Sequence, residues 1–211
     1  MTKKKRSTRF QNYCYLCTKI KNIMGVCINV GNAGFQRVRN SEYVDKSGLI
    51  SIVNSTLFTE RSFSCVSRSR RFGKSVAAKM LCAYYDQSCD SRHLFADLEI
   101  ASDPSFEKHL NKYPVIYLDL TSFIADRGDD TIVDKMDVAL RADIGKVYPD
   151  VPGEEGDRLM DYLLRVVEVT AQPFIFIIDE WDAICREYAS GTQAMDRYVG
   201  WLRRMFKSQE A

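Results

Sequence analysis

The stretch that decides the fold is "CVSRSRRFGKSVAAKM", residues 65–80, where an apolar run leads through an arginine-rich loop into Gly-Lys-Ser and a helical pattern. A strand, a loop and a helix in this order are typical of a phosphate-binding loop, because the first N–H groups and the dipole of the helix favour an anion. Such loops usually open with a glycine five residues before Gly73, and that position is Arg68. The sequence therefore predicts a phosphate site with an unusual first half.

The second half of the loop carries the expected chemistry. Gly73 has no Cβ, so the backbone can approach a phosphate closely. Lys74 would reach the β- and γ-phosphates of a nucleotide, and the hydroxyl of Ser75 would bind Mg²⁺. We therefore expect ATP and Mg²⁺ as ligands, with nucleotide contacts from Arg70, Arg71, Phe72, Gly73, Lys74, Ser75 and Val76.

The arginines of the loop leave two interpretations open. Arg70 and Arg71 would either neutralise phosphate charge or pair with surface carboxylates. For Arg68 the surface role is favoured, since an arginine can replace the first glycine only where the local φ is negative.

A second motif, "PFIFIIDEWD" at residues 173–182, is an apolar strand that ends abruptly in acid. This is the Walker B pattern, in which Asp179 would bind Mg²⁺ and Glu180 would polarise the attacking water as the catalytic residue. A carboxylate at the end of a buried strand needs a cation or a donor nearby. Each motif is weak evidence alone, but in this order, about a hundred residues apart, they predict one site on neighbouring strands.

Predicted strands alternate with predicted helices along the chain. Strands are expected at 61–67, 114–120 and 173–182, and helices at 43–57, 74–86, 129–148, 156–172 and 192–208. Their continuous apolar runs predict an α/β fold with a mostly parallel sheet covered on both faces. The apolar stripe of the helix at 129–148 is expected to comprise Ile132, Met136, Val138, Leu140, Ile144 and Val147.

Composition limits the class of protein. The 211 residues suffice for one α/β domain, and no apolar run approaches the length of about 18 residues that a membrane span needs. Seven cysteines, an odd number in a chain of this size, indicate reduced thiols and a cytoplasmic protein. Cys14 and Cys17 form a CxxC pair, for which chance is favoured over a zinc site because further ligands are distant.

Residues 1–23 form a basic head with seven Lys or Arg residues and no acid. Because the whole chain carries +2, the remaining residues sum to −5. We expect the head to be a solvated, disordered tail, with an organellar transit peptide as the alternative. The expected second unit is residues 24–211.

Several long motifs carry a resemblance to a known family: "GNAGFQRVRNSEYVDKSGLI", "SRSRRFGKS", "MLCAYYDQSCDSRHLF", "EKHLNKYPVIYLDLTSF" and "FIFIIDEWD". Over roughly residues 24–206 the chain resembles the bacterial AAA-ATPase-like family, in which an RRFGKS loop replaces the usual first glycine. The resemblance implies an ATP-binding P-loop NTPase with a three-layer sandwich. Similar proteins continue further, so the resemblance also implies truncation after Walker B, with a sheet incomplete at the C-terminus and Met24 as an alternative start.

Three functions remain open. The first is an ATP-binding domain that hydrolyses ATP if the elements supplied by longer relatives are dispensable. The second is a non-hydrolysing interaction module, which binds a partner protein or a second copy and uses nucleotide only as a switch. The third, nucleic-acid binding through the basic head, ranks below both.

Before the loop, Tyr43, Asp45 and Lys46 would line the base, brace the loop or simply dock a helix.

Overall fold

The structure is a computed structural model that describes residues 27–67, 69, 71–124, 130–188 and 191–207. The basic head 1–23 with its CxxC pair, Arg68 and Arg70 lie outside the described residues, so the expectations for them stay predictions.

The described elements are mostly helices, and the two strands do not alternate with single helices as the sequence predicts. The elements are α2 (Ala33–Arg39), α3 (Gly48–Thr56), α4 (Lys74–Tyr85), α5 (Arg92–Phe95), η1 (Glu99–Ser102), α6 (Phe106–His109), β1 (Val115–Asp119), η2 (Leu120–Phe123), α7 (Ile132–Val147), α8 (Leu159–Thr170), β2 (Ile175–Asp179), α9 (Ala183–Glu187) and α10 (Gln193–Lys207). The five longer predicted helices are confirmed as α3, α4, α7, α8 and α10, and two of the three predicted strands as β1 and β2.

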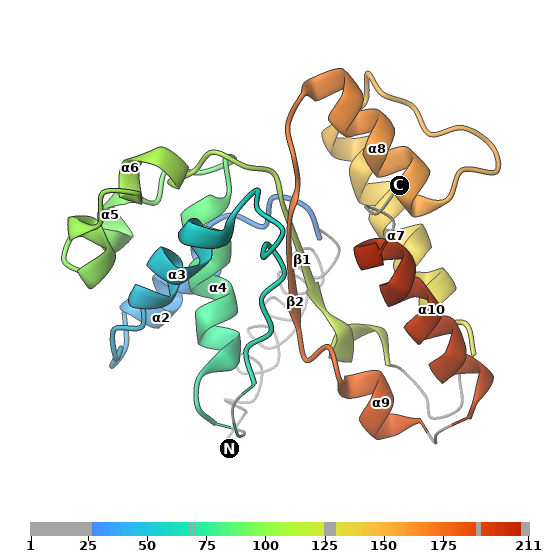
Figure 1. The fold of residues 1–211 in the computed structure, drawn as a ribbon, viewed down its shortest axis with the longest axis horizontal. Coiled ribbons are helices and arrows are strands. Elements are labelled where there is room, and N and C mark those ends of the chain that lie inside the picture. The colour runs from blue at the N-terminus through green and yellow to red at the C-terminus, as the bar shows by residue number, and fades with distance from the viewer. Residues whose placement is uncertain (1–26, 68, 70, 125–129, 189–190, 208–211) are drawn as a thin grey trace, which may run out of the picture.

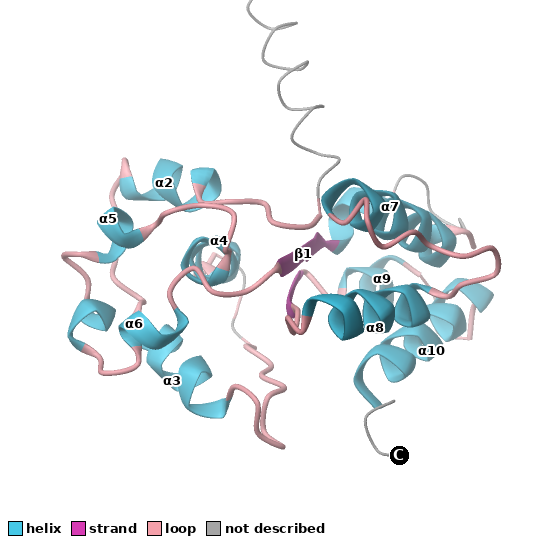
Figure 2. Cartoon of the chain, turned by 90° about the horizontal axis from the view of Figure 1, so that it is seen from above, coloured by secondary structure: helices cyan, strands magenta, loops and turns pink. Residues whose placement is uncertain are grey.

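The two strands form a parallel sheet with helices on both faces. Val115 pairs with Ile175 and Asp119 with Asp179, so both strands end in an aspartate at the same edge. Figure 1 shows α4 on one side of the strands and α7, α8 and α10 on the other, and Figure 2 shows the same division from above. The described residues thus form an α/β fold around a small, two-stranded sheet.

Side chains of the strands alternate between two hydrophobic cores, as the twofold period of a strand requires. Ile116 and Leu118 of β1 face the core shared with α7, α8 and α10, where Leu140 and Tyr198 are fully buried. Val115 of β1 and residues of β2 face the core around α4, which also contains side chains of α2, α3 and α5. The two-stranded sheet therefore lies between the two cores.

The predicted strand at 61–67 is wrong. These residues are exposed coil between α3 and α4, and the side chain of Phe63 is 57% exposed. A strand is stabilised by its ladder and by cover on one face, and local β propensity does not replace them. The ring of Phe63 instead contacts that of Phe206 in α10, at 5.4 Å between centroids.

Val138 was predicted to join the apolar stripe of α7, and this is also wrong, because the side chain is 68% exposed. The buried residues Ile132, Met136, Leu140 and Ile144 follow each other at intervals of four. Val138 follows Met136 by two residues, and at about 100° per residue this turns it to roughly the opposite side of the helix. The stripe is therefore narrower than predicted.

Candidate functional site

The start of α4 and the carboxyl end of β2 lie at one edge of the structure (Figure 1) and enclose an open cavity of about 340 Å³. The Gly-Lys-Ser loop and the acidic end of β2, about a hundred residues apart in the sequence, therefore border one cavity. This is expected where ligands bind beyond the carboxyl ends of parallel strands. The cavity is lined by Ser69, Arg71, Gly73, Lys74, Ser75, Val76 and Glu180.

The loop before α4 has a backbone suited to a close ligand. Gly73 is the N-cap of α4 with φ +80°, a left-handed conformation that glycine adopts without strain. Arg71 has φ +68°, which is unusual for a residue with a side chain. Such conformations cluster at functional sites because surrounding contacts hold them.

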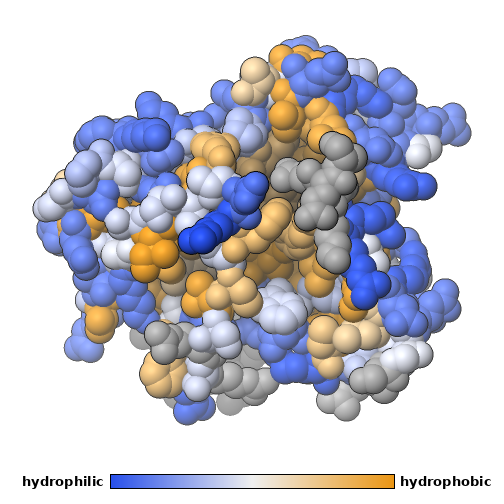
Figure 3. All heavy atoms as spheres, viewed as in Figure 1, coloured by the Kyte–Doolittle hydropathy of each residue, from blue (hydrophilic) through white to orange (hydrophobic). Residues whose placement is uncertain are grey.

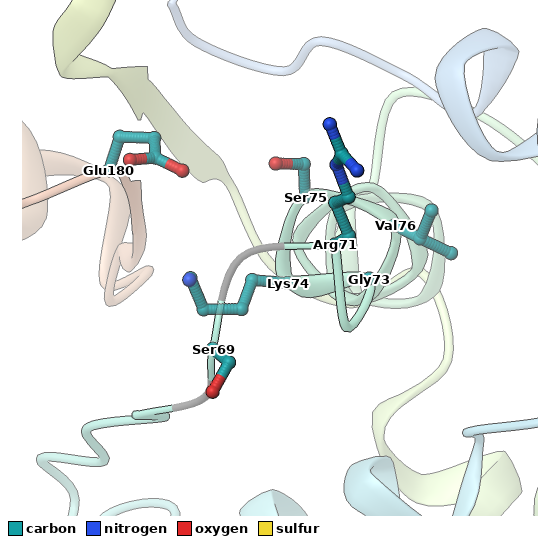
Figure 4. Close-up of a pocket in the computed structure, with 7 residues that line it drawn as sticks. All are labelled: Ser69, Arg71, Gly73, Lys74, Ser75, Val76 and Glu180. Atoms are coloured by element: carbon teal, nitrogen blue, oxygen red, sulfur yellow. The ribbon is translucent and has the colours of Figure 1, made fainter.

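Side chains of the loop point in different directions (Figure 4). The hydroxyl of Ser75 and the ammonium group of Lys74 lie on the side of α4 that faces Glu180, whereas the side chain of Val76 points away from it. Phe72 is 64% exposed and does not line the cavity. Of the predicted loop residues, Lys74 and Ser75 thus offer side-chain groups to the space that Glu180 borders.

Lys46 braces the loop from outside. Its Nζ donates a 2.6 Å hydrogen bond to the carbonyl oxygen of Phe72, and a Cβ at Gly73 would clash with this ammonium group. Its neighbours dock α3 instead: Asp45 accepts bonds from the N–H groups of Ser47 and Glu99, both at 2.8 Å. Of the roles open for this segment, the structure therefore favours bracing for Lys46 and helix docking for Asp45.

Asp179 is the last residue of β2 and is only 6% exposed. Its Oδ1 accepts the Glu180 N–H at 3.0 Å, and its Oδ2 accepts the Tyr117 hydroxyl at 3.4 Å. Burial, with the Asp179 carboxylate adding to it, raises the pKa of Tyr117, so this hydroxyl stays a donor. The bond partly satisfies an otherwise costly buried carboxylate, and β1 supplies it from Tyr117, whose register partner is Ile177, two positions before Asp179.

The donors around the cavity fit Mg²⁺ rather than a softer metal. Ser75 and Glu180 line the cavity, whereas the buried Asp179 precedes Glu180 and does not line it. All three offer only oxygen atoms, and Mg²⁺ typically takes one or two carboxylates and completes its shell with phosphate and water. Within the described residues no group of three or more His, Cys, Asp or Glu side chains could hold a metal by itself.

Glu180 does not stand alone at the rim of the cavity. Its backbone has φ +51°, and its Oε2 lies 2.7 Å from Nη2 of Arg186 in α9. Nη1 of the same arginine lies 2.5 Å from Oδ2 of Asp182. The pKa of Asp182 is lowered, mainly by its hydrogen bond to Arg186 and in smaller part by the charges of Arg186 and Lys74. Lys74 therefore acts electrostatically on this cluster.

Sequence reasoning missed Ser69, Tyr117 and Arg186. For Arg186 a signal existed, since it follows Asp182 by four residues, a spacing that pairs opposite charges on a helix. Tyr117 carries no local signal, because only the pairing of β1 with β2 brings it to Asp179.

No helix in the described ranges is long and apolar enough to cross a membrane. Comparison with known proteins identified one family model, described as "Predicted AAA-ATPase", which matches residues 29–210. No curated protein and no solved structure matches the chain. Because the family model covers most of the 211 residues, the chain belongs to this AAA-ATPase-like family.

Proposed function

We propose that residues 24–211 form a P-loop NTPase domain that binds ATP with Mg²⁺ and hydrolyses it. The observation that carries the proposal is the shared cavity, in which Lys74 and Ser75 of the Gly-Lys-Ser loop face Glu180 of the acidic strand end. Membership of the AAA-ATPase-like family supports nucleotide binding independently. We also propose the three-layer sandwich of P-loop proteins for this domain. The helices on both faces of β1 and β2 are consistent with it.

In this proposal the chain's residues bind and orient the triphosphate. The N–H groups at the start of α4 donate hydrogen bonds to the phosphate oxygens, Lys74 pairs with the β- and γ-phosphate oxygens, and Arg71 adds charge at the loop. Ser75 and Asp179 would hold Mg²⁺, which when bound neutralises phosphate charge. Glu180 orients the water that attacks the γ-phosphate, so positioning and electrostatics account for the reaction.

The test is binding of a fluorescent ATP analogue with Mg²⁺ to the full chain and to Lys74→Ala. We expect micromolar binding by the wild type and a loss of about 100-fold or more in the variant, because the lysine bonds two phosphates. Lys79→Ala is the matched control, since Lys79 lies on the same helix and its side chain packs near Gly34. Equal binding by all three proteins, or none by a folded wild type, would contradict the proposal.

A second candidate is a nucleotide-dependent interaction module that does not hydrolyse ATP. Large apolar side chains are exposed on the two segments that border the cavity, Phe72 at 64% and Trp181 at 47%. Figure 3 shows further apolar surface in the hollow between the α4 side and the α10 side. These groups would contact a partner protein or a second copy.

Sedimentation velocity with and without a non-hydrolysable ATP analogue tests self-association. An analogue-dependent shift to a larger species that Trp181→Ala removes would support a second copy as partner. Leu164→Ala is the control, since Leu164 is 61% exposed on α8. A species that the analogue does not change would argue against nucleotide-dependent self-association.

A further inference from the structure

Arg186 links two carboxylates at the rim of the cavity through different nitrogen atoms. Nη2 pairs with Glu180 at 2.7 Å and Nη1 with Asp182 at 2.5 Å. Both contacts fall within one short stretch, because Glu180 directly follows β2 and Arg186 lies in α9, whose N-cap is Asp182. One contact can therefore be exchanged while the other keeps the guanidinium in place.

The position of this guanidinium relative to the phosphate loop is the second observation. Glu180 lines the same cavity as Gly73, Lys74 and Ser75, and Arg186, which does not line it, is joined to that lining residue by a contact of 2.7 Å. The Lys74 charge also lowers the pKa of Asp182, which places the other partner of Arg186 within electrostatic reach of the loop. The side chain of Arg186 is 33% exposed and is not locked in a core.

A guanidinium binds carboxylate and phosphate through the same planar fork. A terminal phosphate next to Lys74 would offer Arg186 an anion with more charge and more acceptor oxygens than the single Glu180 carboxylate. The Glu180 oxygen that accepts from Arg186 has part of its acceptor capacity engaged, and losing that contact would free it for a water. If Arg186 bound the γ-phosphate, it would therefore release the carboxylate of Glu180 at the same time.

We propose that Arg186 distinguishes nucleoside triphosphate from diphosphate: it pairs with Glu180 when no γ-phosphate is bound, and it transfers Nη2 to the γ-phosphate when one is. Asp182 retains Nη1 in both states. Arg186 acts on hydrolysis through Glu180 and is in that respect a positioning residue. The inference rests on the proposed ATP site and assigns to Arg186 the discrimination between triphosphate and diphosphate.

The experiment compares affinities of the full chain for ADP and for a non-hydrolysable ATP analogue, both with Mg²⁺, by isothermal titration. In Arg186→Gln we expect the affinity for the analogue to fall about ten-fold, the size of one charge-assisted hydrogen bond, while the ADP affinity changes less than about two-fold. Arg186→Lys should restore part of the preference, because it keeps the charge without the fork.

Glu180→Gln provides a second readout. Removing the competing carboxylate should raise the affinity of the wild-type background for the ATP analogue a few-fold, and should have no such effect in the Arg186→Gln background. A purely structural arginine would give equal effects in both backgrounds. Arg165→Gln is the matched control, because Arg165 also bridges two carboxylates, Asp157 and Glu154, but does not line the cavity.

Two failures are distinguishable. If the folded wild type binds neither nucleotide, the proposed function fails and the inference fails with it. If the wild type binds both, and Arg186→Gln lowers both affinities alike or neither, the ATP site stands and the role of Arg186 is wrong. Thermal melting of each variant identifies a loss that comes from unfolding, in which case Arg186→Lys decides the outcome.

Discussion

The ammonium group of Lys46 donates a hydrogen bond of 2.6 Å to the carbonyl oxygen of Phe72, the residue directly before Gly73. Lys46 precedes α3, and its own N–H donates to the hydroxyl of Tyr43, whose side chain contacts Met80 in α4. A segment outside the cavity thus ties the phosphate loop to the body of the protein. The bond satisfies a loop carbonyl with a charged donor and limits how the chain can turn at Gly73.

Lys46→Met should weaken nucleotide binding about ten-fold without a large loss of stability. The variant keeps the aliphatic part of the side chain but removes the charged donor, so the loop at Phe72 loses its external contact. Binding of the fluorescent ATP analogue and thermal melting measure the two effects. Lys112→Met, at an exposed lysine, is the control. An unchanged affinity in Lys46→Met would show that the loop does not need the brace.

Glu180→Gln should lower ATP turnover about 100-fold while nucleotide binding is retained or strengthened. The amide fills the same volume but cannot act as a base toward water. Phosphate release under saturating ATP measures turnover, and Glu187→Gln, at an exposed glutamate of α9, controls for the loss of one negative charge. Equal turnover in the wild type and Glu180→Gln would leave the non-hydrolysing module as the better function.

Cysteine labelling should separate Cys27 from Cys65. Burial, with the Asp143 carboxylate adding to it, raises the pKa of Cys27 from 9.0 to about 11. Since only the thiolate reacts, about 0.1% of Cys27 is reactive at pH 8, and its rate should rise about ten-fold per pH unit up to about pH 11. Cys65 is exposed and should react first.

Peptide mapping after brief treatment with a maleimide at pH 7, 8 and 9 resolves the cysteines individually. Cys82, which is 3% exposed, should remain unlabelled until the protein unfolds. Labelling of Cys27 as fast as Cys65 at pH 8 would contradict the packing of Cys27 in the structure.

Leu140→Ala and Val138→Ala test the core of α7. Leu140 is fully buried in the core that β1, α8 and α10 also line, so its truncation should lower the free energy of unfolding by about 2–5 kcal/mol. Val138 is 68% exposed, and the same kind of change there should stay within about 0.5 kcal/mol. Urea unfolding curves of both variants give the comparison. Similar losses would mean that α7 is turned differently against the sheet.

The sequence predicted the helices and two strands because their signals are local. Apolar residues at intervals of three and four mark α4, α7, α8 and α10, and the uninterrupted apolar runs at 114–120 and 173–182 mark β1 and β2. The strand at 61–67 failed for the opposite reason. Its β-like composition is local, but a strand also needs a paired neighbour, which the described residues do not provide there.

The sequence by itself determined which residues the candidate site contains. These are Gly73, Lys74 and Ser75 at the start of a helix, and Asp179 and Glu180 at the end of an apolar strand. Only the tertiary structure decided which residues from distant segments contact them. Parallel pairing of β1 with β2 brings Tyr117 to Asp179, and the packing of α3 on α4 brings Lys46 to Phe72. The physical reason is range: helical period and glycine backbone freedom act over a few residues, whereas hydrogen bonds between distant segments form only when packing sets their separation.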